Sequence, residues 1–72
     1  MKYAVVFDPA DDGSWGAVVP DLPGCTSAGD TLDEARLNVR EAIELWIEVE
    51  RERGHDVPPP ITVAEPVEVG SL

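Results

Sequence analysis

The sequence predicts an α+β fold with the element order β-β-β-α-β, in which one long helix packs on one face of a sheet. Two stretches near the N-terminus, residues 2–8 and 14–19, alternate apolar residues with period two, as strands do. Residues 32–53 instead repeat apolar residues every three or four positions, which is typical of an amphipathic helix. The chain has 72 residues and no internal repeat, so we expect one two-layer domain over residues 1–72.

The first two strands are predicted to form a hairpin. Lys2–Asp8 ends before a proline, and Ser14–Val19 follows the turn sequence Asp11-Asp12-Gly13, in which glycine accepts positive φ. Each strand gathers larger apolar residues on one face: Tyr3, Val5 and Phe7 in the first, and Trp15, Ala17 and Val19 in the second.

A turn-rich segment, Asp21–Thr31, connects the hairpin to the helix. Pro23-Gly24 is a strong turn signal, because proline presets φ and glycine accepts positive φ. Pro20 and Pro23 also lack amide donors, so the second strand has to end near them. Cys25–Ala28 is short and mildly β-prone, and we expect it to form a short edge strand.

The helix is predicted over Leu32–Arg53. Thr31 and Glu34 fit a capping box, in which the glutamate side chain reaches back to the amide of the cap residue. Gly54 suits the position after the last turn. Such a helix is about 33 Å long, whereas strands of five or six residues span about 17–20 Å, so the helix overhangs its sheet. The apolar stripe comprises Leu32, Ala35, Val39, Ala42, Ile43 and Trp46, while Leu37 and Leu45 fall off it.

The C-terminal part is predicted to be a stiff connector followed by a fourth strand. Asp56–Pro60 contains three consecutive prolines, which favour an extended backbone. Ile61–Val69 alternates apolar residues again, but Pro66 interrupts it, and proline is tolerated in sheets mainly at an edge. We therefore expect an edge strand, or a partly disordered segment.

The chain is strongly acidic, with fifteen acidic and five basic residues and a net charge of −10. Direct binding to DNA or RNA requires a basic face, so we expect none. A basic protein partner suits this charge, and so does a surface that is merely well hydrated. The single cysteine excludes an internal disulfide, and no apolar run approaches the ~20 residues of a membrane helix. We expect a cytoplasmic protein.

No set of residues has the spacing of a catalytic or metal site. The acidic residues Asp8, Asp11 and Asp12 lack the spacing of a calcium loop and are typical turn formers. Cys25 has no base nearby in the sequence, since His55, the only histidine, lies beyond the helix. The apolar strands do not supply the carboxylates that a metal nuclease needs. We therefore expect no enzymatic activity, no cofactor and no metal.

One long stretch carries a family resemblance. V-P-D-L-P-G-C-T-S-A-G-D-T-L-D-E-A, preceded by Trp15-Gly16 and followed by E-A-I-E-L-W in the helix, resembles the HicB-like antitoxin family, and the similarity runs from Met1 to the prolines at 58–60. The resemblance implies a partial RNase H-like domain with sheet order 3-2-1-4, strand 4 lying parallel to strand 1. It also implies an antitoxin that neutralises a small, basic, HicA-type toxin that cleaves mRNA.

Two further expectations depart from that picture. Many family members carry a C-terminal DNA-binding domain, whereas this sequence ends at Leu72 without one, so we expect no operator binding. The alternative function is a stand-alone oligomeric binding or scaffold module with no toxin partner. The candidate residues for binding a partner are Trp15, Asp21, Glu41, Glu44 and Glu48.

A homo-oligomer, a dimer or larger, is also predicted. A core built from 72 residues is marginal, and the overhanging end of the helix needs cover that the C-terminal segment or another subunit has to provide. Edge strands with unpaired backbone groups offer a second reason to associate. The candidate interface residues are Trp46, Ile47, Val49, Val63 and Val67.

Overall fold

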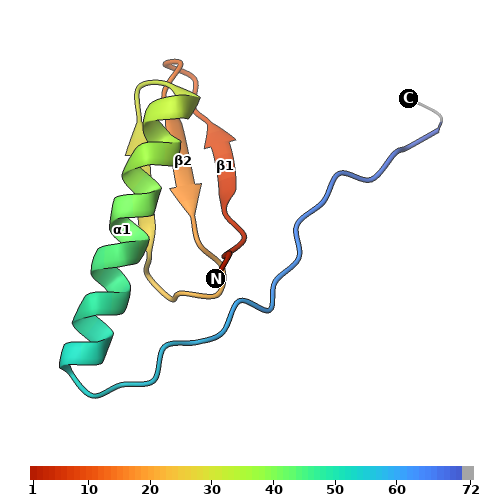
Figure 1. Ribbon diagram of the computed structural model, residues 1–72. Coiled ribbons are helices and arrows are strands. Elements are labelled where there is room, and N and C mark those ends of the chain that lie inside the picture. The colour runs from red at the N-terminus through yellow and green to blue at the C-terminus, as the bar shows by residue number, and fades with distance from the viewer. Residues whose placement is uncertain (71–72) are drawn as a thin grey trace.

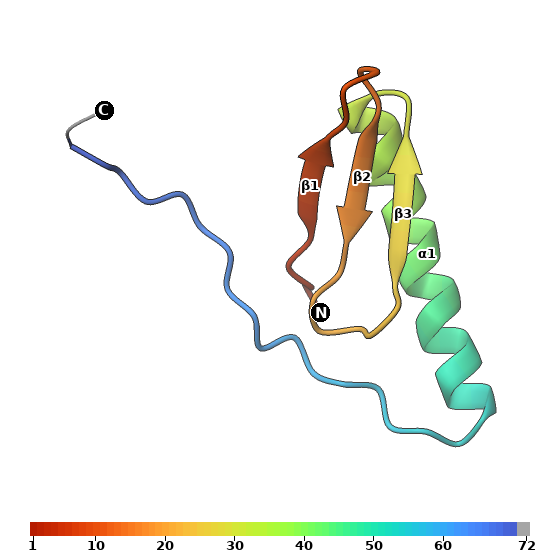
Figure 2. The same ribbon diagram turned by 180° about the vertical axis from the view of Figure 1, so that it is seen from behind.

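A three-stranded antiparallel sheet covered by one helix makes up the body of the computed structural model, which describes residues 1–70 (Figure 1). The helix packs over β3 and β2, and β1 lies at the opposite edge (Figure 2). The predicted α+β class, with one long helix on one face of the sheet, is confirmed. The elements are β1 (Val6–Pro9), β2 (Trp15–Val18), β3 (Thr26–Gly29) and α1 (Leu32–Glu52), and the sheet order is β1-β2-β3.

The β1–β2 pairing is shorter than the sequence predicts. Its register places Val6 opposite Val18, and the four residues before Val6 that were expected in the strand lie outside it. Backbone groups of a strand point alternately to its two neighbours. Val19 donates its N–H to Cys25 on the β3 side at 3.1 Å, so the next donor toward β1 would be Pro20, which has none. The ladder therefore stops at Val18.

The core is small. Among the described residues, the largest fully enclosed side chains are those of Leu22 and Val19. Leu22 comes from the loop between β2 and β3. Tyr3, Val5 and Phe7 pack against this cluster, which confirms the face predicted for the first strand. The buried apolar residues are Ala17, Val19, Leu22, Cys25, Ala35 and Val39.

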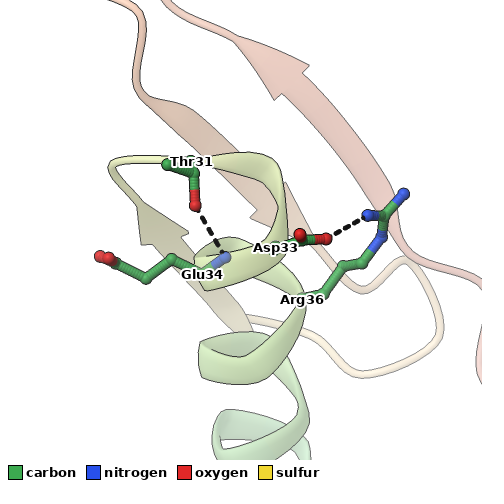
Figure 3. A network of polar contacts seen from close by, with 4 residues as sticks. All are labelled: Thr31, Asp33, Glu34 and Arg36. Carbon is green, nitrogen blue, oxygen red and sulfur yellow. Dashed lines mark hydrogen bonds and ion pairs between the residues drawn. The ribbon is translucent and has the colours of Figure 1, made fainter.

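Both ends of α1 are capped by local sequence. Thr31 Oγ1 accepts the N–H of Glu34 at 3.1 Å, as Figure 3 shows together with the Asp33–Arg36 ion pair. The Glu34 side chain accepts the N–H of Asp30 at 3.1 Å, so the prediction that it reaches the amide of Thr31 itself is wrong by one residue.

The C-terminal end of α1 closes in a Schellman motif. Gly54 has φ of 74° and donates to Arg51 O at 3.1 Å, while His55 donates to Glu50 O at 2.9 Å. These two bonds satisfy carbonyl groups that the last turn leaves free, and they turn the chain back under the sheet.

The predicted fourth strand, Ile61–Val69, is wrong for the part of the chain that the structure describes. The sheet ends at β1, so neither the order 3-2-1-4 nor a strand parallel to β1 forms. The segment is extended but leaves the body on the β1 side and points away from it (Figures 1 and 2). Two causes act together: consecutive prolines keep residues 58–60 stiff, and hydrogen bonds to Asp21 fix the chain at residues 61 and 62.

Candidate partner-binding surfaces

The helix carries an exposed face that is both acidic and apolar. Successive residues are about 100° apart around a helix, so residues three, four, seven and eight positions apart share a face. Leu37 and Leu45 lie on this face, and their side chains are 58% and 61% exposed. Together with three exposed glutamates they form what we call the outer face of α1: Leu37, Glu41, Glu44, Leu45 and Glu48.

This outer face unites three of the five residues predicted to bind a partner. Glu41, Glu44 and Glu48 lie on it, and the exposed Arg40 and Arg51 border it. From the sequence the two leucines give only weak support for association with another subunit, because single exposed leucines are common. Their place among the glutamates is what makes them candidate anchors, and helical periodicity is the signal that identifies them.

The other two predicted partner-binding residues lie elsewhere. Trp15 is half-buried at the start of the central strand, where its backbone pairs with Pro9 on one side and Gly29 on the other. Asp21 lies in the loop after β2, and its carboxylate is occupied by hydrogen bonds from Ile61 and Thr62. The structure therefore does not bring these two residues to the outer face of α1.

The overhang of the helix receives cover from within the chain. Trp46 is half-buried against the core and donates its indole N–H to Pro23 O at 3.0 Å, and Val57 packs against the same cluster. Ile47 and Val49 are half-buried. An open cavity of about 350 Å³ remains beside Trp46 and Val49, on the side of β3. The loop before β3 and the connector after α1 thus cover part of the overhanging end of the helix.

A second open cavity lies between β1 and α1, and its lining differs in charge from the rest of the molecule. Its volume is about 520 Å³. Three of the chain's five basic residues line it, and no acidic residue does. We call it the β1–α1 groove, lined by Met1, Lys2, Tyr3, Val5, Phe7, Arg36, Val39, Arg40 and Ile43. Its bases come from positions far apart in the sequence, so no local pattern predicts it.

Hydrogen bonds with Tyr3 and Asp21 attach the segment between the helix and residue 62 to the body of the domain. Tyr3 donates its hydroxyl to Pro58 O at 2.6 Å. The Asp21 carboxylate accepts the N–H groups of Ile61 and Thr62 at 3.0 and 2.9 Å and the Thr62 hydroxyl at 2.6 Å. These bonds to Thr62 and Ile61 hold the pKa of Asp21 below its ordinary value. We call residues 57–62 the tail root and residues 63–70 the tail.

Asp12, Cys25 and His55, the titratable residues that stand out in the sequence, are accounted for by local contacts or burial. Asp12 accepts the hydroxyl and the N–H of Ser14 at 2.6 and 2.9 Å, and these bonds lower its pKa. Burial raises the pKa of the Cys25 thiol, which makes it a poorer nucleophile. His55 Nδ1 lies 2.7 Å from Glu50 Oε2 at the helix end.

Neither a metal site nor a membrane helix is found within residues 1–70. No three of their histidine, cysteine, aspartate and glutamate side chains are grouped to hold a metal ion. Among the same residues, the helix is too polar to cross a lipid bilayer.

Comparison with known proteins gives consistent results. Residues 3–69 match the model of the HicB-like antitoxins of bacterial toxin–antitoxin systems. A UPF0150 protein of Archaeoglobus fulgidus is 45% identical over 51 residues, which cover 71% of this chain and 74% of that protein. Antitoxin HicB 2 of Photorhabdus laumondii is 31% identical over 65 residues, which cover 90% of this chain but 46% of that protein.

A solved structure shares the fold. The N-terminal domain of the Burkholderia pseudomallei antitoxin HicB superimposes with a TM-score of 0.79 at 36% sequence identity. The match covers 88% of this chain and 74% of that one. The arrangement of three antiparallel strands and one helix is therefore that of an antitoxin domain.

Proposed function

Because the chain belongs to the HicB-like antitoxin family of bacterial toxin–antitoxin systems, we propose that it binds and neutralises a small, basic, HicA-type toxin that cleaves mRNA. The family supports an antitoxin role in general. The type of toxin is proposed on the chemistry of the surface, since an RNA-cleaving protein needs a basic face to hold the phosphate backbone.

The outer face of α1 is the observation that carries this proposal. Its three glutamates are spaced three and four residues apart, about one per helical turn, so they form a row of carboxylates along the axis. Such a row attracts the same basic surface that attracts a row of phosphates. Leu45 lies within the row and Leu37 lies one turn before it, and both add exposed apolar area that a partner can bury.

In this proposal the antitoxin acts by competition. The acidic helix covers the toxin's basic RNA-binding surface, so that mRNA no longer reaches the catalytic residues. The net charge of −10 accelerates the encounter, while the leucines slow dissociation. Inhibition should therefore weaken as salt rises, because screening shortens the range of the attraction to about 8 Å at physiological ionic strength.

An mRNA cleavage assay tests the proposal directly. The assay takes as its toxin the product of any HicA-like gene that lies next to the gene for this chain, and inhibition is measured by titration with the purified antitoxin. The triple variant Glu41→Lys, Glu44→Lys, Glu48→Lys should lose inhibition. The matched control Asp8→Lys, Asp11→Lys, Asp56→Lys changes three exposed acids elsewhere by the same charge and should inhibit nearly as well as the wild type.

The outcomes are distinct. Equal inhibition by both triple variants, with helical circular dichroism retained, would show that net charge or another surface is responsible. Absence of any HicA-like gene beside this one, together with a stable homo-oligomer, would favour the alternative of a stand-alone binding or scaffold module.

We further propose that the chain neither cleaves nor binds nucleic acid itself. With fifteen acids against five bases, its average surface repels phosphates. Gel shifts with the DNA upstream of its gene at ~150 mM salt should show no specific complex. RNA and DNA incubated with the protein and Mg²⁺ or Mn²⁺ should remain intact. Cleavage that disappears in Asp8→Ala would overturn this part of the proposal.

Homo-oligomerisation completes the proposal. The exposed apolar side chains extend beyond the outer face of α1 to the tail, where Val63 and Val67 are each 79% exposed. Leaving so much apolar area in water is unfavourable for a protein with so small a core. Trp46, Ile47 and Val49 are proposed to contribute through their exposed parts. The expected solution mass is at least twice the 7.8 kDa of one chain.

A further inference from the structure

We propose that the tail of one protomer binds in the β1–α1 groove of a second copy, along the free edge of β1, in a reciprocal exchange. This inference deepens the oligomer part of the proposed function and rests on it, but it requires no toxin. The position beside β1 is the one that the family resemblance implies for a fourth strand, and the proposal assigns that position to the partner's chain.

The acceptor is an open strand edge above an apolar groove. β1 pairs with β2 on one side, and no other described strand pairs with its outer side. Residues 2–5 continue β1 without a partner on β2, because Pro20 ends that ladder. A strand added here would place alternate side chains over Val5, Phe7 and the flank of α1.

The donor is a strand-like segment with no use inside its own chain. No hydrogen bond joins residues 63–70 to the rest of the described chain, and Val63, Val67 and Val69 are 79%, 79% and 61% exposed. The seven residues from Val63 to Val69 span about 23 Å when extended. The edge from residue 2 to residue 9 spans about 26 Å, so donor and acceptor match in length. Period-two alternation puts Val63, Glu65, Val67 and Val69 on one face, toward the groove, and Glu68 on the other face.

Charge selects this groove over the rest of the molecule. The tail carries Glu65 and Glu68 and no base, whereas the groove carries Lys2, Arg36 and Arg40 and no acid. Elsewhere acids predominate, so an acidic tail would be repelled. Arg36 is paired with Asp33 at 2.7 Å, but both side chains are largely exposed, and such a pair exchanges partners at little cost.

The tail root explains why the groove occupied belongs to another copy. Three hydrogen bonds to Asp21 fix residues 61 and 62, and Tyr3 holds Pro58, so the direction in which the tail leaves is set. That direction leads away from β1 of the same chain (Figures 1 and 2). A two-fold axis relates two such tails to two such grooves and closes the assembly.

Charge exchange between donor and acceptor tests the proposal. One variant carries Arg36→Glu and Arg40→Glu in the groove, and the other carries Glu65→Arg and Glu68→Arg in the tail. Each alone should run as a 7.8 kDa monomer in size exclusion with light scattering, whereas wild type runs as a dimer or larger. An equimolar mixture should regain the wild-type mass, because each groove then meets a tail of opposite charge in the other protomer.

Several results would overturn the proposal. A wild-type monomer at tens of micromolar excludes the exchange. Dimers that survive in both charge variants would place the interface elsewhere. A mixture that does not reassociate would mean that the interface lies elsewhere or that the tail binds the groove of its own chain. The double variant Arg51→Glu, Arg53→Glu is the matched control, since it makes the same charge change at two exposed arginines outside groove and tail, and it should leave the mass unchanged.

The measurements distinguish loss of folding, loss of assembly and loss of toxin inhibition. The tail variant changes only side chains without contacts to the body, so its helical circular dichroism should equal that of the wild type. Mass is measured without toxin. Loss of assembly with inhibition retained would therefore leave the antitoxin proposal standing, and the reverse result would leave the exchange standing.

Discussion

Thr62 donates both its backbone N–H and its hydroxyl to the carboxylate of Asp21, 41 positions earlier in the sequence, at 2.9 and 2.6 Å. Ile61 donates a third bond at 3.0 Å. One carboxylate in the loop after β2 thus fixes the point from which the C-terminal tail departs. Asp21 belongs to the family-like stretch of the sequence, and its observed role is to position the tail.

Replacing this carboxylate should release the tail root. Asp21→Ala removes both carboxylate oxygens, so the amides of Ile61 and Thr62 and the Thr62 hydroxyl lose their acceptors. Both amides should exchange hydrogen faster, as measured by NMR or by mass spectrometry of the C-terminal peptide. Asp8→Ala removes an exposed carboxylate elsewhere and should leave them unchanged. Equal exchange in both variants would contradict the assigned role.

Acid should release the same contact in the wild type. The folded pKa of Asp21 lies below its ordinary value of 3.8, so the unfolded or released state binds the proton more tightly. The contribution of these bonds is therefore complete above pH ~3.8 and is lost as pH falls through the lowered pKa. The Thr62 amide resonance, followed by NMR, should titrate below pH 3.8. A midpoint above that value would contradict the assignment.

Gly29 should tolerate no side chain. A Cβ there would lie 2.4 Å from Ala35 N and 2.8 Å from Glu34 C, both backbone atoms of the first turns of α1. Gly29→Ala should therefore destabilise the fold by about 1–3 kcal/mol, measured by urea unfolding. The control Gly16→Ala meets only Asp8 O at 3.9 Å and should change stability by less than ~0.5 kcal/mol.

The cap at Thr31 should matter through its hydroxyl. Thr31→Ala removes the acceptor of the Glu34 N–H and should cost about 1 kcal/mol of unfolding free energy. Thr31→Ser keeps the oxygen and should retain most of the stability in thermal melts. Similar losses in both variants would mean that the methyl group, not the cap bond, is responsible.

The indole of Trp46 should stabilise the protomer through one hydrogen bond and through packing. Trp46→Phe removes the N–H that binds Pro23 O and should cost about 0.5–1.5 kcal/mol. Trp46→Ala should cost more, because it also removes ring contacts with the core. The exposed neighbour Leu45 serves as control, and Leu45→Ala should stay within ~0.5 kcal/mol. Loss of assembly in Trp46→Ala without loss of stability would mean that the indole acts in the subunit interface alone and does not stabilise the protomer.

The sequence by itself determined the elements that local chemistry specifies. Helix α1 begins one residue after a capping threonine and ends before Gly54, as the stripe and caps predict. The faces of the hairpin follow from alternation, and the turns from glycine and proline. These features depend on residues a few positions apart, so they can be read without knowing the fold.

Only the tertiary structure decided the features that join distant positions. Alternation in Ile61–Val69 predicts a strand, but a strand forms only where a neighbour supplies hydrogen bonds, and here Asp21 directs the chain away from β1. The β1–α1 groove likewise brings together Lys2, which precedes β1, and Arg36 and Arg40, which lie in the first half of α1. Such pairings are set by the path of the whole chain, because no local pattern encodes which edge stays open or which charges meet across it.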